Sequence, residues 1–207
     1  PVRDTPNVFF GYTAYDAVRY FENVPVSGKD ACFDGIPDMM YILYRYIIAV
    51  NHYNNQMTIV ENLPEGETTR IDEVIGIIRN HNVPQYRFQA ADDIESPVTD
   101  AQYRDMVSEG VRHCLRGDVF QIVLSRRFSQ GFSGDEFNVY RALRCVNPSP
   151  YLFYFDFGSF RVFGSSPETH LRIQGGRAYI DPIAGTFKRT GDDVRDSIPI
   201  TCASAVT

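Results

Sequence analysis

The stretch NPSPYLFYFDFGSFRVFGSSPETHLRI, residues 147–173, decides the fold class. Two runs rich in aromatic and β-branched residues flank the pair Gly158-Ser159. Runs of this kind around a short turn predict a β-hairpin. Pro167 has no N–H to donate to a strand ladder, so it predicts a bend after the second run. Glu168 is therefore expected at a bend beside a sheet.

Helical and strand patterns alternate along the rest of the chain. Apolar residues at helical spacing predict a short amphipathic helix behind a threonine cap in 68–82, a second helix over 99–115 that stops at Gly117, and a third that ends at the NPSP cluster. Two further hairpins are expected, together with a strand at 120–128 and a linker at 90–97. One hairpin turns at 52–55 and the other at 174–176. The sequence therefore predicts an α+β protein rich in antiparallel sheet with flanking helices.

Composition narrows the classes of partner. The chain has 207 residues and a net charge of -6, and nucleic-acid binding normally needs a basic patch, so no nucleic-acid partner is expected. The longest apolar run contains Arg45 and is too short to span a bilayer, so no membrane partner is expected. The four cysteines are too far apart for a CxxC motif and are typical of reduced thiols in a cytoplasmic protein: Cys32, Cys114, Cys145 and Cys202.

Four segments are candidates for chemistry, and each also has a purely structural interpretation. Glu168 is either a solvated loop carboxylate or an acid whose pKa the surrounding aromatic strands raise by desolvation. Gly185-Thr186 is either a tight turn or a carboxylate-binding turn with free amides and a hydroxyl. Gln121 lies either on an edge strand in water or among aliphatic residues, where its amide needs a partner such as a ligand. Residues 147–153 form either a core strand or a rigid surface for a flat ring.

Five segments, taken in order, resemble the chorismate-utilising enzyme family. They are FGYTAYDAVRYFE (10–22), GDVFQIVLSRRF (117–128), NPSPYLFYFDF (147–157), FGSSPETHLRI (163–173) and DPIAGTFKR (181–189). The likeness is strongest to the anthranilate synthase component I branch. It implies an α+β sandwich, with residues 1–207 as one synthase domain that is incomplete at both ends. In this interpretation 1–90 is the N-terminal part, 99–189 is the core with the SPE and AGT motifs, and 190–207 is an unassigned tail.

The resemblance also implies roles for single residues. Glu168 corresponds to the general acid that helps the C4 hydroxyl of chorismate leave, and Gly185 and Thr186 correspond to substrate contacts. Gln121 and Ala184 stand where relatives with other products carry lysine, so both are expected at the substrate. Their identity favours the reaction of chorismate with ammonia to anthranilate and pyruvate. Aminodeoxychorismate synthase component I is the alternative, because some of its members lack the lysine.

Further implications concern cofactors, partners and regulation. Family members bind Mg²⁺ through glutamates that are expected beyond the C-terminus of this chain, so no metal ligand is expected on it. A glutamine amidotransferase subunit would supply ammonia, and tryptophan would inhibit through Asn147, Pro150, Tyr151 and Leu152, the last in place of a common methionine. The implied protein is a cytoplasmic lyase. The isolated chain is expected to be an inactive fragment, and a non-catalytic binding or scaffolding piece is the rival interpretation.

Overall fold

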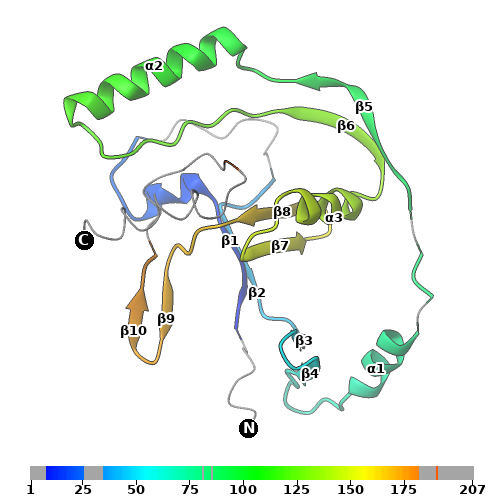
Figure 1. Ribbon diagram of the computed structural model, residues 1–207. Helices are drawn as coiled ribbons and strands as arrows, with labels where there is room; N and C mark the ends of the chain where they lie inside the picture. Colours follow the sequence, from blue (N-terminus) through cyan, green and yellow to red (C-terminus); the bar gives the residue numbers. More distant parts are fainter. Residues whose placement is uncertain (1–7, 26–34, 81, 85, 182–189, 191–207) are drawn as a thin grey trace. The chain divides into compact units, whose positions relative to one another are not determined.

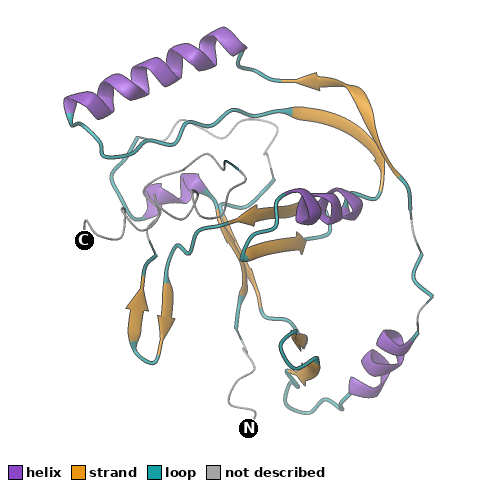
Figure 2. Cartoon of the chain, in the orientation of Figure 1, coloured by secondary structure: helices purple, strands orange, loops and turns teal. Residues whose placement is uncertain are grey.

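The computed structural model describes residues 8–25, 35–80, 82–84, 86–181 and 190. Within these residues the strands form five two-stranded sheets, interspersed with helices (Figures 1 and 2), which confirms the predicted α+β class. The chain divides into two compact units. Unit 1 comprises residues 1–136 and 155–161, and unit 2 comprises 137–154 and 162–207. Their boundary falls inside the segment 99–189 that the sequence predicted as one core.

The first sheet of unit 1 joins β1 (Phe10–Thr13) to β2 (Met39–Ile42) in antiparallel register. A Cβ at Gly11 would lie 1.8 Å from the Met40 carbonyl oxygen, so only glycine allows this close pairing. The 3₁₀ helix η1 (Tyr15–Tyr20) follows β1. Its Arg19 forms an ion pair with the buried Asp38, which also accepts a hydrogen bond from the Tyr20 hydroxyl at 2.8 Å.

The hairpin predicted around residues 52–55 is confirmed as β3 (Tyr46–Asn51) and β4 (Gln56–Glu61), paired from Tyr46↔Glu61 to Asn51↔Gln56. The apolar pattern from Met39 to Asn51 predicts one longer first strand, but 39–42 belongs to β2 and pairs with β1 instead.

Helix α1 (Ile71–Arg79) confirms the predicted amphipathic helix but not its cap. The N-cap residue is Arg70, which makes no side-chain capping bond. Thr69 lies one residue too early, and its hydroxyl accepts the Ile71 N–H only at 3.4 Å while donating to Glu61. Tertiary contact with β4 therefore replaces the expected local cap.

The predicted linker at 90–97 is wrong, because most of it belongs to β5 (Phe88–Glu95). This strand pairs antiparallel with β6 (Ser129–Gly134), with an irregularity between Ala90 and Ile94. The rings of Phe88 and Phe132 stack with centroids 5.5 Å apart. The partner strand lies beyond a whole helix in the sequence, so local composition could not reveal the pairing.

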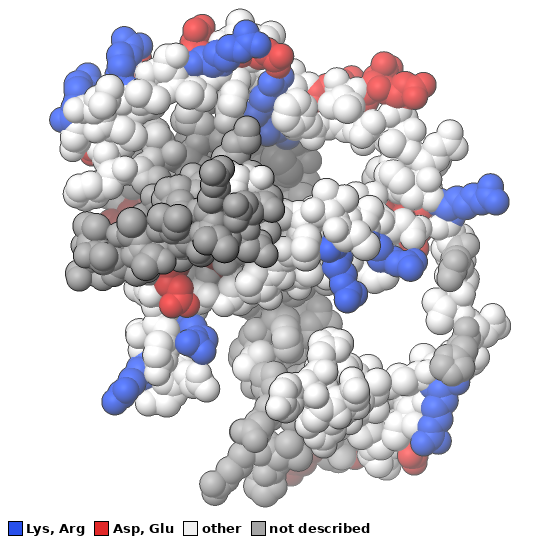
Figure 3. Space-filling view, viewed as in Figure 1, with Lys and Arg blue, Asp and Glu red and all other residues white. Residues whose placement is uncertain are grey.

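Helix α2 (Asp100–Arg116) begins and ends where the sequence predicted. Thr99 and Gln102 form a capping box, and Gly117 closes the helix in the left-handed conformation with φ 81°. Charged side chains of both signs lie over α2 at the top of Figure 3. No helix among the described residues is long and apolar enough to cross a membrane.

Residues 121–128, predicted as a strand, have no ladder partner in the described part of the chain. Side chains of this segment nevertheless alternate between α2 and solvent. A Cβ at Gly110 of α2 would lie 3.3 Å from Ile122 and 3.5 Å from Leu124, while Val123 is 84% exposed. Arg126 donates to Asp100 at 2.6 Å, which fixes the segment to the start of α2.

Unit 2 contains helix α3 (Phe137–Val146), most of the hairpin formed by β7 (Tyr151–Asp156) and β8 (Arg161–Ser166), and the hairpin β9 (Arg172–Gln174) with β10 (Arg177–Tyr179). All of these elements were predicted. The tip of the β7–β8 hairpin groups with unit 1, where the Tyr12 ring meets Phe157 at 5.5 Å.

Candidate active site

An aromatic cluster fixes α3 on the β7–β8 hairpin. Tyr154 of β7 lies at its centre, with ring centroids 5.0 Å from Phe137, 5.5 Å from Tyr140 and 5.7 Å from Phe163. Ring pairs of this geometry add to the apolar contact itself. These contacts hold the N-terminal half of α3, the helix that ends at Val146, on the hairpin.

The segment Asn147–Leu152 follows α3 directly. The Asn147 N–H donates to Leu143 O at 2.8 Å, and the next residue, Pro148, cannot continue the helix. Asn147 and Pro150 are exposed and Leu152 is half-buried, while Tyr151 is 43% exposed. The four residues predicted for an inhibitor site thus lie on one short segment that two prolines stiffen.

The loop that carries Glu168 follows β8 directly. The Glu168 N–H donates to the Ser166 hydroxyl at 3.3 Å across Pro167, which confirms the predicted bend. The Glu168 side chain is exposed, so of the two interpretations left open by the sequence the described residues show the solvated loop carboxylate, without desolvation by the aromatic strands. The rings of these strands contact α3, β1 or one another instead.

Hydrogen bonds join the Glu168 loop to the segment 147–151. Ser165 donates to Asn147 O at 2.6 Å and lies 2.7 Å from the Ser149 hydroxyl. The hydroxyls of Tyr151 and Thr169 also hydrogen-bond to each other. The structure therefore brings the predicted catalytic and inhibitor segments together in unit 2. The sequence did not predict the roles of Ser165 and Thr169. The signal that could have indicated them is the high content of hydroxyl side chains in SSPET, residues 165–169.

The other predicted substrate residues lie elsewhere. Gln121 is exposed in unit 1, so of its two interpretations the described residues show the one in contact with water, not burial among aliphatic residues. Ala184, Gly185 and Thr186 lie outside the described residues.

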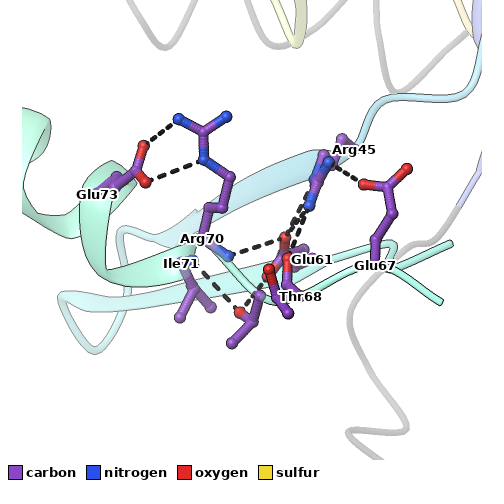
Figure 4. A network of polar contacts seen from close by, with 8 residues as sticks. Arg45, Glu61, Glu67, Thr68, Arg70, Ile71 and Glu73 are labelled. Carbon is purple, nitrogen blue, oxygen red and sulfur yellow. Dashed lines mark hydrogen bonds and ion pairs between the residues drawn. The ribbon is translucent and has the colours of Figure 1, made fainter.

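A second polar cluster lies in unit 1, between the β3–β4 hairpin and α1 (Figure 4). Arg45 donates to Glu61 at 3.1 Å, to Glu67 at 2.5 Å and to the Thr68 carbonyl at 3.2 Å. Hydrogen bonds from Thr69, Arg45 and the Arg70 backbone hold the pKa of Glu61 below its usual range. Each carboxylate of the cluster has a cationic partner, so the cluster acts as a structural clasp.

The acidic and histidine side chains of the described residues do not form a metal centre. They contain no group of three or more His, Cys, Asp or Glu that could hold an ion. At the end of α2, Asp118 and Glu109 lie on opposite ring nitrogens of His113, at 2.8 and 3.4 Å, and cannot converge on one ion.

Comparison with known proteins identifies the family. Residues 1–198 match the model of the chorismate binding enzymes. The match therefore includes residues 190–198, which belong to the tail that the sequence analysis left unassigned. The chain is 32% identical to anthranilate synthase component 1 of Acetivibrio thermocellus over 86% of this chain and 39% of that protein. It is 33% identical to the chloroplastic anthranilate synthase alpha subunit 1 of Arabidopsis thaliana, over 94% of this chain and 37% of that protein.

A solved structure supports the same assignment. The crystal structure of anthranilate synthase component I from Streptococcus pneumoniae TIGR4 superposes with a TM-score of 0.65 and 26% identity, over 82% of this chain and 40% of that chain. The chain thus spans about two fifths of the length of these relatives. Because the family match covers nearly all residues and includes the Glu168 loop, the chain belongs to the chorismate binding enzyme family.

Proposed function

We propose that the complete natural polypeptide containing this sequence (the complete protein) forms anthranilate and pyruvate from chorismate and ammonia, with Glu168 as general acid. The observation that carries the proposal is the Ser166-Pro167-Glu168 bend, held on the 147–151 segment, in a chain whose relatives are named anthranilate synthases. The names of these relatives support the reaction, and the bend fixes the backbone that carries the carboxyl group.

The proton balance assigns the role of Glu168. Ammonia adds to the ring, the C4 hydroxyl leaves as water, and loss of pyruvate makes the ring aromatic. A hydroxide is a poor leaving group, so a positioned acid that donates a proton to it accelerates the step. A general acid must hold its proton until the step in which it donates it, and burial of a carboxyl group favours the protonated form. The proposal therefore requires that substrate, or residues outside those described, cover the Glu168 side chain during the reaction.

The residue types at two positions favour ammonia as the nucleophile. Ammonia needs no base for its activation, whereas water does, and a covalent route needs an amine on the protein. Gln121 and Ala184 supply neither a base nor an amine. Aminodeoxychorismate formation, also from ammonia, remains the second candidate because the same two residues permit it.

Mg²⁺, regulation and partners belong to the proposal for the complete protein. The described residues do not fit a Mg²⁺ site, since they contain no cluster of acidic ligands, and we assign no catalytic step to the ion here. We include a glutamine amidotransferase partner, inhibition by tryptophan at 147–152, assignment to the lyases and a cytoplasmic location as parts of the same proposal. The resemblance of the NPSPYLF segment supports the inhibitor role.

Substitution of the acid tests the proposal. Glu168→Gln in the complete protein is expected to lower anthranilate formation by about 10²–10⁴-fold, because it removes one general acid but keeps the shape of the side chain. Chorismate affinity, measured by calorimetry, should change little. Glu65→Gln, at another exposed glutamate, is the control and should retain full turnover. More than a tenth of wild-type turnover in Glu168→Gln would contradict the assignment.

A further inference from the structure

Hydroxyl groups hold the Glu168 loop on both sides of the carboxylate. On the N-terminal side, the Ser166 hydroxyl accepts the Glu168 N–H at 3.3 Å. On the C-terminal side, Thr169 hydrogen-bonds to the Tyr151 hydroxyl. The first contact is local to the bend, whereas the second joins the bend to Tyr151, the first residue of the β7–β8 hairpin.

The partner segment is itself well fixed. Tyr151 is the first residue of β7, and Pro148 and Pro150 restrict the backbone that leads to it. Ser165, at the end of β8, donates to Asn147 O at 2.6 Å. The aromatic contacts of Tyr154 with Phe137 and Phe163 hold the helix that ends at this segment. The segment can therefore serve as a reference surface for the loop.

Hydrogen bonds of Ser165 and of Thr169 join the Glu168 loop to the 147–151 segment. Of these two residues, Thr169 is the one next to Glu168 in the sequence. The Ser165 tie fixes the strand end before the bend. Without the Thr169 tie, Glu168 would keep, among the described residues, its backbone hydrogen bonds with the Ser166 hydroxyl, so the direction of the Glu168 side chain would be less defined.

We propose that Tyr151 and Thr169 are positioning residues, whose mutual hydrogen bond sets the orientation of the Glu168 loop on the 147–151 segment. The catalytic meaning of this pair rests on the proposed function, because it acts through Glu168. Any change that displaces the Tyr151 hydroxyl then alters turnover through Glu168 without a change in the acid itself.

Paired substitutions that each remove one hydroxyl test the pair in the complete protein. In Tyr151→Phe and in Thr169→Val, amide hydrogen exchange in peptides that cover 166–171 should accelerate about two- to tenfold, as expected for loss of one partly exposed hydrogen bond. The double variant should exchange no faster than either single variant, because both remove the same bond. Thr169→Ser keeps the hydroxyl and should restore the wild-type rate.

Tyr140→Phe is the matched control, since Tyr140 contacts Phe137, Tyr154 and Phe163 through its ring in the same unit. It should leave exchange in 166–171 unchanged. Three results would each overturn the proposed role of the Tyr151–Thr169 hydrogen bond. They are unchanged exchange in both single variants, an equal acceleration in Tyr140→Phe, and exchange in Thr169→Ser that stays faster than in wild type.

Kinetics separate this inference from the proposed function. If the complete protein forms anthranilate, kcat in Tyr151→Phe and Thr169→Val should fall by about threefold or more, up to 10²-fold, with KM for chorismate nearly constant. Altered exchange with unchanged kcat would overturn the positioning role. If wild type forms no anthranilate, the proposed function fails, and the exchange data alone decide whether the pair orients the loop.

Discussion

At the scale of single residues, two glutamates of this chain have opposite environments. The side chain of Glu61 is only 6% exposed and is held by Arg45, Thr69 and the Arg70 backbone, whereas Glu168 is exposed beside a proline bend. A carboxylate surrounded by donors stays ionised and fixes structure. An acid catalyst needs a free carboxyl group that can hold and release a proton. The local contacts thus assign a structural role to Glu61 and leave Glu168 available for chemistry.

The Glu61 clasp predicts a pH dependence of stability. The folded-state pKa of Glu61 is lowered, first by the hydrogen bond from Thr69, so its contribution is complete above the unfolded pKa of about 4.3 and is lost as pH falls through the folded value. Glu61→Gln should therefore melt at a lower temperature than wild type at pH 7, and the difference should shrink below about pH 4. Calorimetry of the complete protein at both pH values measures this.

Glu65→Gln provides the comparison, because Glu65 lies in the neighbouring loop and is exposed. Its melting temperature should follow that of wild type across the pH range. A Glu61→Gln deficit that stays constant down to pH 3 would show that packing, and not the ionised carboxylate, stabilises the clasp.

At the scale of elements, helices and hairpins with local signals were predictable, apart from the cap of α1, whereas long-range strand pairings were not. Helix α2 was predictable because its capping residues lie at its own ends, at Thr99 and Gly117. Strand β5 was missed because its partner, β6, follows α2, and because AADDIE lacks the alternation typical of a half-buried strand. The β-branched residues of 121–128 predicted a strand, yet the ladder forms at 129–134. Strand pairing depends on neighbours that composition does not show.

The capping box of α2 gives a prediction at this scale. Thr99 accepts the Gln102 N–H at 3.3 Å, and Gln102 accepts the Thr99 N–H at 2.9 Å. Thr99→Ala should destabilise the first turn by about 1 kcal/mol, which accelerates its amide exchange about fivefold. Thr99→Ser keeps the hydroxyl and should exchange like wild type. Equal exchange in the alanine and serine variants would show that the cap contributes nothing to the helix.

At the scale of the whole molecule, sequence motifs identified the family, while the arrangement of the site was only partly predictable. Five ordered motifs indicated the chorismate-utilising enzymes, and the family match over residues 1–198 confirms this. The bend at Pro167 was predictable because proline acts locally. The Tyr151–Thr169 bond was not, since it joins the first residue of a hairpin to the loop that follows the hairpin. The predicted substrate turn at 184–186 lies outside the described residues, so its role stays a prediction.

Product identity is the most direct test of the proposed function. The complete protein is incubated with chorismate, an ammonium salt and Mg²⁺, and the products are separated by chromatography and identified by mass and fluorescence. Anthranilate and pyruvate should form in equal amounts, with no accumulation of aminodeoxychorismate, and Glu168→Gln should form neither at a comparable rate. Aminodeoxychorismate as the sole product, without release of pyruvate, would contradict the account and assign the chain to the alternative branch of the family.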